Sequence, residues 1–483
     1  MSMSRWIVFG IASAILIGIG FWTNRRIKKA ADSEEGFLLG AKEMGPFVAA
    51  GTLMATGYSG WGFIGSPGTT YAYGTIEILG NFFFAPAITF GALFFANFMR
   101  KKGEECGGLT VPEYLAATHK GPHGLKRCVH FFAGLATFIF LSVYIVGQIR
   151  AVGYVASEWL GISAELSAML FMVVIVIFTM QGGLLAVAIT DTLMCMGMLV
   201  ASVIVYFTII QDVSLTELIA NVSASKPEFI NPTTSVPYGQ GKYSVFLVFI
   251  YALLFTTTLP YMSVRFLAFK KNLKVHVMAL MMAPMGILLS LVPFVGLYMF
   301  YKNPNLTNPD SAMPVFLNTY LHPAVGSIIS LFIMFAMLST ISSVLQALAS
   351  ALSYDMFVAV ADRHSKYKDL FNRGAVAVTA LLGIIFTYLV PQGMLNHIAY
   401  IGTGGLISMF VGPIIMRVLV EANLLACFSS MIVGFSLNVY LVLFAKVGWV
   451  EAPIMAGVGG CIVYLILGYV GNGMRRAPLP SEA

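Results

Sequence analysis

One long apolar stretch of the sequence carries small and hydroxyl residues at helical spacing. They stand at positions i, i+3, i+4 and i+7 and so share one face of a helix: Ala336, Ser339, Thr340 and Ser343. Hydroxyl and carbonyl oxygens are the ligands that a hard cation such as Na⁺ accepts. Ser and Thr also bond back to their own helix backbone, so the pattern alone favours a structural role over a cation site.

A second candidate for cation chemistry is the glycine-rich segment 55–62. Glycines stand at Gly57, Gly60 and Gly62 and, just beyond the segment, at Gly65, and each lowers helix stability by about 1 kcal/mol. An unwound stretch here would leave backbone carbonyls available to a cation. Close helix packing through small residues is an equally good explanation of this segment alone.

Two apolar segments are interrupted at matching places in the chain. The first runs over 45–68, and the second runs over 244–266 and is interrupted at residues 256–260. Each opens a set of five predicted membrane spans. Interrupted helices at corresponding positions of two halves indicate the midplane binding site of a secondary transporter. Unwound backbone is tolerated there because it lines a cavity or binds an ion.

A few polar side chains fall inside apolar segments. Asp191 stands near the start of a predicted span. Its carboxylate has three possible roles: an ion pair with a cation such as Arg265, a helix N-terminal role, or a functional role. For Arg150, we expect a side chain that extends to the outer surface rather than one that contacts an anionic substrate. Tyr144 and Gln148 are four residues apart, so they can orient a polar ligand or hydrogen-bond within the core.

Composition defines the broad class of the protein. Apolar residues make up 58% of the 483 residues and charged residues only 10%, whereas a soluble domain has about 25% charged residues. We therefore expect an all-α polytopic membrane protein. The net charge of +7 does not indicate nucleic-acid binding, because the cations gather beside span ends. No metal-ligand spacing or nucleophile–base arrangement is present, which argues against an enzyme.

Apolar runs of membrane-crossing length predict about 13 spans. We expect a single transmembrane transporter domain that spans residues 1–483, with five plus five spans in an inverted repeat. Its predicted parts are an extra N-terminal helix, two repeats and two extra C-terminal helices, at 4–23, 46–209, 244–416 and 423–471.

The distribution of Lys and Arg predicts the orientation of the chain. Positive residues concentrate in 25–42, 100–127, 265–274 and 363–373, and they are rare in the intervening loops. Because cytoplasmic loops carry an excess of Lys and Arg, we expect an outside N-terminus and a cytoplasmic C-terminus in the plasma (inner) membrane. The long polar segments 210–243 and 302–322 would then be outer loops or short surface helices.

Four segments resemble the sodium:solute symporter family, which includes the proline and pantothenate transporters. They are GYSGWGFIGSPGTTYAYG (57–74), GGLLAVAITDTL (182–193), LPYMSVRFLAF (259–269) and FAMLSTISSVLQALASALSYDMF (335–357). The first and third look most like the pantothenate branch, although Tyr261 stands where that branch has His. With the span layout, the resemblance covers nearly the whole chain and implies the leucine-transporter fold.

The resemblance implies a Na⁺ site between the first broken helix and the ninth predicted span. The implied ligands are three carbonyls and two hydroxyls, from Ala55, Tyr58, Ala336, Ser339 and Thr340. The hydroxyl face described first coincides with these positions, which favours sodium. Proline carriers of the family have Asp where this chain has Gly57, which argues against a proline carrier.

The resemblance also implies where a substrate would bind and where the inner gate lies. The substrate is expected between the two broken helices, with wall residues Ser59, Trp61, Tyr144, Gln148 and Tyr261. Asp191 and Arg265 match family positions that we assign to gating or loop-anchoring ion pairs.

These observations lead to one functional hypothesis with three alternatives. We expect a Na⁺-coupled symporter that imports a small organic solute, a pantothenate-like carboxylate, by alternating access. The alternatives are a Na⁺/amino acid (proline-like) symporter, a proton-coupled transporter and a membrane-embedded solute sensor. The expected partners are the solute, Na⁺ as the coupling ion and the lipid bilayer, with no nucleic acid and no required oligomer.

Overall fold

The computed structural model describes residues 2–30, 33–362, 367–389 and 395–472, and the regular elements within them are helices. The α-helices are α1 (Ser2–Ala30), α2 (Ser33–Leu39), α3 (Pro46–Gly60), α4 (Ser66–Tyr73), α5 (Thr75–Cys106), α6 (Val111–Thr118), α7 (His123–Leu160), α8 (Ala164–Asp212), α9 (Leu215–Ser225), α10 (Leu247–Thr258), α11 (Pro260–Leu267), α12 (Val275–Leu289), α13 (Phe294–Lys302), α14 (Ala312–Thr319), α15 (Pro323–Ser350), α16 (Phe357–Ala361), α17 (Lys368–Leu389), α18 (Leu395–Ile415), α19 (Leu424–Leu443) and α20 (Glu451–Asn472).

The longer of these helices are apolar enough to cross a membrane. Nine helices of the described residues meet both criteria, and the bent pair α10–α11 makes a tenth span. The expected count of about 13 is not confirmed. The predicted spans 164–181 and 186–209 both lie within the 49-residue element α8, where the non-helical backbone of Gly183 separates two helices that meet at a kink.

The bend in α8 lies at Gly183. Its φ of 51° is in the left-handed region, which glycine adopts without the steric cost of a side chain. A Cβ at this position would lie 2.3 Å from the carbonyl oxygen of Phe37, which follows α1 on the segment leading to α3. The bend therefore accommodates the close passage of that segment.

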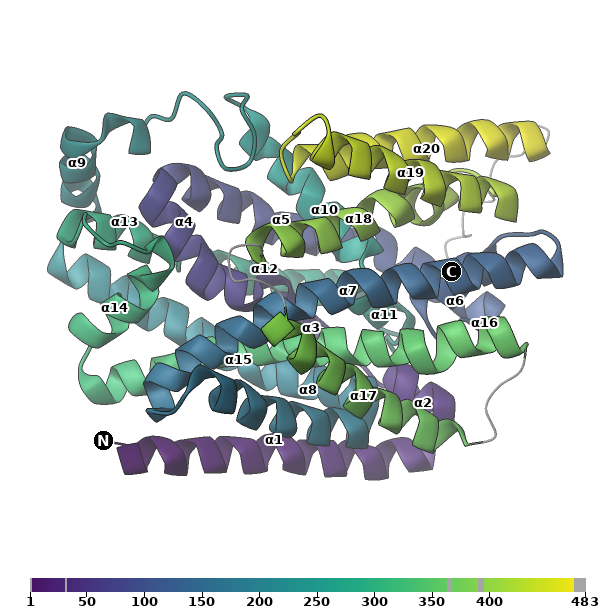
Figure 1. Ribbon diagram of the computed structural model, residues 1–483, viewed down its shortest axis with the longest axis horizontal. Helices are drawn as coiled ribbons and strands as arrows, with labels where there is room; N and C mark the ends of the chain where they lie inside the picture. Colours follow the sequence, from purple (N-terminus) through teal and green to yellow (C-terminus); the bar gives the residue numbers. More distant parts are fainter. Residues whose placement is uncertain (1, 31–32, 363–366, 390–394, 473–483) are drawn as a thin grey trace.

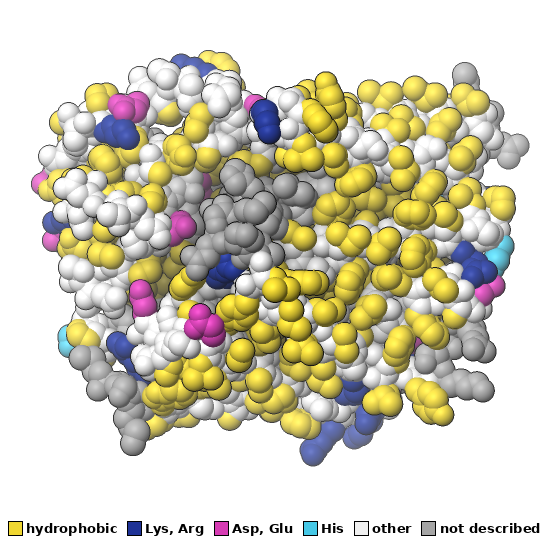
Figure 2. Space-filling view, in the orientation of Figure 1, with side chains coloured by type: hydrophobic (Ala, Val, Ile, Leu, Met, Phe, Trp, Pro, Cys, Tyr) yellow, Lys and Arg dark blue, Asp and Glu magenta, His cyan; other side chains and the backbone are white. Residues whose placement is uncertain are grey.

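The spans run along the long axis of the molecule and surround α15 (Figure 1). α15 and the short helices after it form the most enclosed span, with 83% of its apolar window buried, and α15 packs against α3, α7 and α8. α1 lies along one edge and α19 and α20 along the opposite edge (Figure 1). Apolar side chains cover most of the central and right-hand part of the face in Figure 2, as a lipid-facing surface requires.

The connecting helices separate by end. α9, α13 and α14 lie at the end where α1 begins, and α2, α6 and α16 lie at the other end (Figure 1). The two long polar segments expected at the outer surface, 210–243 and 302–322, contain the short helices α9 and α14. The loops predicted to be outside and inside are thus at opposite ends of the molecule.

Candidate functional site

The first broken helix is interrupted at Ser59. This residue has φ 45° and ψ −169°, a combination that non-glycine residues adopt only at a cost of about 1–3 kcal/mol. The chain continues as one π-helical turn, η2 (Trp61–Gly65), and then as α4. The Ser59 hydroxyl accepts a hydrogen bond of 3.1 Å from the backbone N–H of Trp61, which holds the interrupted turn together.

The second broken helix changes direction between α10 and α11. Leu259 is extended, with φ −72° and ψ 124°, and the two helices meet at 57°. Pro260 follows at once and lacks the N–H that a continuous helix would need at this position. The interruption expected within residues 256–260 is confirmed.

Backbone and side-chain oxygens converge beside the first break. The hydroxyl of Ser339 donates to the carbonyls of Ala336 (3.0 Å) and Ala55 (3.3 Å). The hydroxyl of Thr340 lies 3.4 Å from the carbonyls of both Ala336 and Thr56. All of these residues are fully buried. We call this group of neutral oxygens, contributed by α3 and α15, the oxygen cluster.

Tyr58 occupies a different part of the same helix end. Its carbonyl accepts from the N–H of Trp61, and its hydroxyl lies 2.7 Å from the hydroxyl of Ser290. The hydrogen bonds of the described residues therefore join four of the five expected cation ligands, and they do not join the Tyr58 carbonyl to that group.

A buried ion pair lies next to the oxygen cluster. Arg265 on α11 and Asp191 on α8 approach to 3.0 Å, and neither side chain is exposed. Arg265 also donates to the hydroxyls of Thr52 (2.7 Å), Thr56 (2.8 Å) and Ser343 (2.6 Å). A buried pair is stable only when its remaining hydrogen-bonding groups are satisfied, and these hydroxyls from α3 and α15 meet much of that need.

Thr56 belongs to both groups. Its carbonyl contacts Thr340 of the oxygen cluster, and its hydroxyl lies 3.2 Å from the carboxylate of Asp191. Thr56 therefore contacts both the oxygen cluster and the ion pair that joins α8 and α11.

A cavity of about 730 Å³ extends from the first break toward the end of the molecule that carries α14. Four of the five expected substrate residues line it: Ser59, Trp61, Tyr144 and Gln148. At its far end it reaches Asn308 and Pro314 of the segment before and within α14. This size suits a small organic solute.

The fifth expected substrate residue, Tyr261, does not line the cavity. It is fully buried, and its ring stacks on Tyr144 at a centroid distance of 5.8 Å and meets Phe255 edge-on at 6.0 Å. Tyr261 therefore supports the cavity wall from behind.

Much of the cavity wall was not expected from the sequence. It is aromatic and comes from separate elements, with Phe84, Tyr238, Tyr251, Phe255 and Trp449 as members. Single aromatic residues in apolar spans give no signal that separates a cavity wall from a lipid-facing surface. Tyr238 lies in a loop that we expected to be merely polar.

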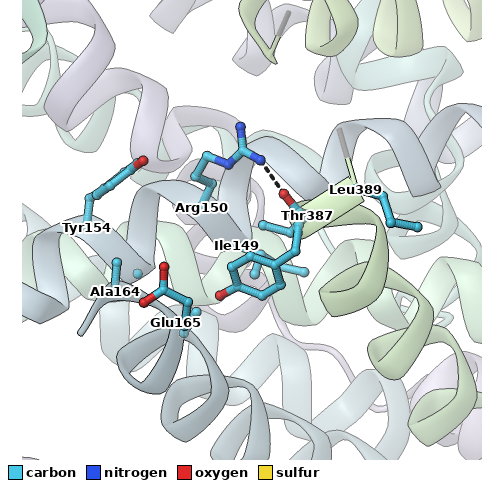
Figure 3. A pocket seen from close by; sticks show the side chains of 10 residues that line it. Ile149, Arg150, Tyr154, Ala164, Glu165, Thr387 and Leu389 are labelled. Carbon is cyan, nitrogen blue, oxygen red and sulfur yellow. Dashed lines mark hydrogen bonds between the residues drawn. The ribbon is translucent and has the colours of Figure 1, made fainter. Parts of the chain in front are cut away.

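Arg150 lies between the main cavity and a second, smaller pocket. It lines the main cavity, and it also lines a side pocket of about 290 Å³ between α7, α8 and α17. Figure 3 shows its guanidinium donating to the carbonyl of Thr387, with Glu165 and Tyr154 around the same pocket. The side chain thus binds a neighbouring helix end rather than only extending to the surface.

Two helices are interrupted, and a buried oxygen cluster lies beside the first break. A cavity leads from that break to one end of the molecule. Together these features define a secondary transporter. Ion and solute sites in such proteins are built where discontinuous helices meet near the membrane midplane.

The chain belongs to the sodium:solute symporter family, whose sequence profile matches residues 37–434. Curated relatives include sodium/proline symporters of Staphylococcus aureus strains JH9 and N315, each 24% identical over 98% of this chain and 93% of the relative.

Solved structures support the same fold. A Na⁺-coupled sialic acid symporter in a substrate-bound outward-open state aligns with a TM-score of 0.78, at 18% identity over 99% of both chains. A nucleobase-cation-symport-1 family transporter with bromovinylhydantoin bound aligns with a TM-score of 0.51, at 15% identity over 88% of this chain and 91% of that one. The protein is therefore an integral membrane, sodium-coupled transporter of the leucine-transporter fold, and it is not an enzyme.

Proposed function

We propose that this protein imports a small organic carboxylate together with Na⁺ by alternating access. The observation that carries the proposal is the oxygen cluster, which lies beside the floor of the cavity at the break of α3. Carbonyl and hydroxyl oxygens without any nitrogen ligand suit Na⁺. The ligands would be the carbonyls of Ala55 and Ala336 and the hydroxyls of Ser339 and Thr340, joined by the carbonyl of Tyr58 after a small rearrangement.

Sodium would also prepare the substrate site. Ser59 and Trp61 follow the cation ligands on the same interrupted helix, so fixing the helix end fixes two walls of the cavity. Tyr144 and Gln148 would orient the polar groups of the solute, with Tyr261 behind them. The membrane potential adds about 2.3 kcal/mol per charge per 100 mV to inward movement.

Asp191 and Arg265 would form part of the inner gate. Their ion pair and its hydroxyl partners join α3, α8, α11 and α15, and none of these residues is among those that line the cavity. Inward release of Na⁺ and solute would require these contacts to separate.

The proposed layout places two five-span repeats, 46–209 and 244–416, between one extra helix at 4–23 and two at 423–471. The N-terminus would be outside and the C-terminus in the cytoplasm of a plasma membrane. The separation of α9 and α14 from α2, α6 and α16 in Figure 1 supports this arrangement.

A proline-like amino acid is the second candidate substrate. It is favoured by the curated relatives, which are sodium/proline symporters. Gly57, where proline carriers of the family have Asp, favours a pantothenate-like carboxylate instead.

Uptake by the purified chain in proteoliposomes decides among these functions. Radiolabelled pantothenate and proline would be supplied in parallel, with an inward Na⁺ gradient, with an inward proton gradient, or with neither. We expect pantothenate to accumulate only with the Na⁺ gradient, and accumulation of proline alone would overturn the substrate assignment.

The same assay tests the remaining alternatives. Accumulation driven by the proton gradient without Na⁺, and lost in Asp191→Asn, would replace sodium coupling by proton coupling. Solute-dependent changes of tryptophan emission without any accumulation would favour a sensor.

A further inference from the structure

A carboxylate that the sequence analysis did not single out lies buried near the outer end of the molecule. Glu77, in the first turn of α5, has no exposed surface. Its Oε1 accepts from Asn81 (2.7 Å) and from the hydroxyl of Ser66 on α4, and its Oε2 accepts from the hydroxyl of Tyr238. Three neutral donors from three segments of the chain therefore surround one acid.

The donors that surround Glu77 are neutral. Within the described part of the chain, no Lys, Arg or His forms an ion pair with it. A buried carboxylate without a counter-charge is costly in its ionised form, and hydrogen bonds from neutral donors offset only part of that cost. An ionisable residue within a membrane-spanning segment is by default a candidate for an ion, substrate or proton site.

One of the three donors connects Glu77 to the cavity. Tyr238 belongs to the long outer segment between α9 and α10, and it lines the mouth of the cavity. Its ring packs against Trp449 at 5.7 Å, and Trp449 in turn meets Tyr251 edge-on at 5.7 Å. The hydrogen bond to Glu77 therefore fixes this outer segment at the cavity mouth.

Several other titratable groups lie on the elements that pack around Glu77. They are Tyr71 on α4, Asp310 beside α4, Tyr251 on α10 and Glu451 at the start of α20. Their bonds lead elsewhere: Tyr71 donates to the carbonyl of Asn303, Tyr251 pairs with Thr403, and Glu451 accepts from Ser244. Asp310 lies against Gly68 of α4. The titratable side chain that hydrogen-bonds the carboxylate of Glu77 is Tyr238, which is not a member of this group.

We propose that Glu77 is a proton-binding site, and that its protonation loosens Tyr238 and the outer segment from the mouth of the cavity. The proton would come from water in the cavity and bind Oε2, where the Tyr238 hydroxyl now donates. A neutral carboxyl is a weaker acceptor than a carboxylate, so the hydrogen bond to Tyr238 weakens. The site gives a sodium-coupled carrier a response to external pH that is separate from the oxygen cluster.

Tryptophan emission of the purified full chain in detergent tests the proposal without any solute or Na⁺, so an error in the proposed transport function does not affect the outcome. Trp449 packs on Tyr238, so its emission reports this contact. The emission of Trp449 is obtained by subtracting the spectrum of the Trp449→Phe variant from that of the wild type. We expect a one-proton transition in that signal between about pH 5 and pH 9. Absence of any transition would overturn the proposal.

Two variants assign the transition. Glu77→Gln keeps the shape of the side chain and cannot ionise, so the transition should disappear. Tyr238→Phe removes a donor to the ionised form, so the midpoint should rise by about one pH unit. The second variant keeps the proposal testable if the first does not fold.

Matched controls change the same residue types without touching this hydrogen bond. Tyr251→Phe also alters a ring beside Trp449, and Glu451→Gln neutralises another acid that holds the outer segment through Ser244. Both should keep the wild-type midpoint. A transition that persists in Glu77→Gln, or that disappears in Glu451→Gln, would overturn the assignment.

Discussion

The hydroxyls of Ser339 and Thr340 are buried, and each already contacts two carbonyls. Removing one hydroxyl should remove one cation ligand and leave the helix intact. We expect Ser339→Ala or Thr340→Ala to raise the Na⁺ concentration for half-maximal response about tenfold, which corresponds to about 1.4 kcal/mol. A Na⁺ titration of tryptophan emission measures this change.

A control for this prediction lies on the same helix. Ser330 of α15 bonds back to the carbonyl of Gly326 at 2.8 Å and lies away from the oxygen cluster. Ser330→Ala should leave the Na⁺ requirement unchanged. If folded Ser339→Ala and Thr340→Ala proteins also keep it unchanged, the cation site lies elsewhere.

At this scale the sequence indicated some site residues and not others. The hydroxyl face of α15 was visible because helical periodicity places Ser339 and Thr340 together, and the structure brings them to the carbonyl of Ala55. Periodicity gave no signal for the contact between Glu77 and Tyr238. That contact depends on how a loop more than 150 residues away in sequence folds back, which local pattern does not encode.

At the scale of elements, the bend in α8 depends on one glycine. Gly183→Ala would place a Cβ 2.3 Å from the carbonyl oxygen of Phe37, at a φ of 51° that alanine rarely adopts. We expect a loss of about 2 kcal/mol or more in the free energy of unfolding. The midpoint of thermal unfolding in detergent would report it.

Gly10→Ala is the matched change for that measurement. Gly10 also lies within a membrane-length helix, α1, but a Cβ there would meet no atom within 4 Å. Alanine should be neutral or stabilising by up to about 1 kcal/mol. Equal unfolding temperatures for the two variants would show that the bend does not depend on glycine.

A histidine joins α6 to α20 and should make the protein sensitive to acid. His119 is buried, its Nε2 lies 2.8 Å from the Tyr464 hydroxyl and its Nδ1 lies 2.7 Å from the Leu115 carbonyl. Burial, assisted by the nearby charge of Arg417, lowers the pKa of His119 from 6.5 to about 3.

This depressed pKa fixes the sign of the effect. Between pH 6.5 and about 3 the unfolded chain binds a proton at His119 and the folded protein does not. The free energy of unfolding should therefore fall by about 1.4 kcal/mol per pH unit below 6.5, and the contribution of His119 should not change with pH above 6.5. The unfolding temperature should depend less steeply on pH across this range in His119→Gln than in the wild type. His276→Gln, which changes an exposed residue of α12, should keep the wild-type dependence.

The elements themselves were predictable to different degrees. The break before α11 was visible in the sequence because Pro260 cannot continue the hydrogen bonding of a helix. The number of spans stays a prediction, because apolar length alone does not say how helices that meet directly at a kink, such as the two parts of α8 at Gly183, cross the membrane. The short polar helices α9 and α14 fell inside the segments expected to be loops or surface helices.

For the whole molecule, the placement of the connecting helices predicts the sidedness of the protein. Ser225 at the end of α9 and Glu104 near the end of α5 are both exposed, and they belong to segments predicted to lie on opposite sides of the membrane. In a background without the five native cysteines, a membrane-impermeant maleimide should label Ser225→Cys on intact cells. Glu104→Cys should react only after permeabilisation, and the reverse pattern would invert the proposed orientation.

The aromatic outer half of the cavity has a consequence for inhibition. Tyr154, Tyr251 and Trp449 line the cavity in addition to the residues expected to hold the solute. A competitive blocker could keep a carboxylate head at the helix break and extend a flat aromatic tail among these rings, where apolar surface supports affinity. Such a compound would keep the helix bundles apart, so it would arrest the carrier from outside without being transported.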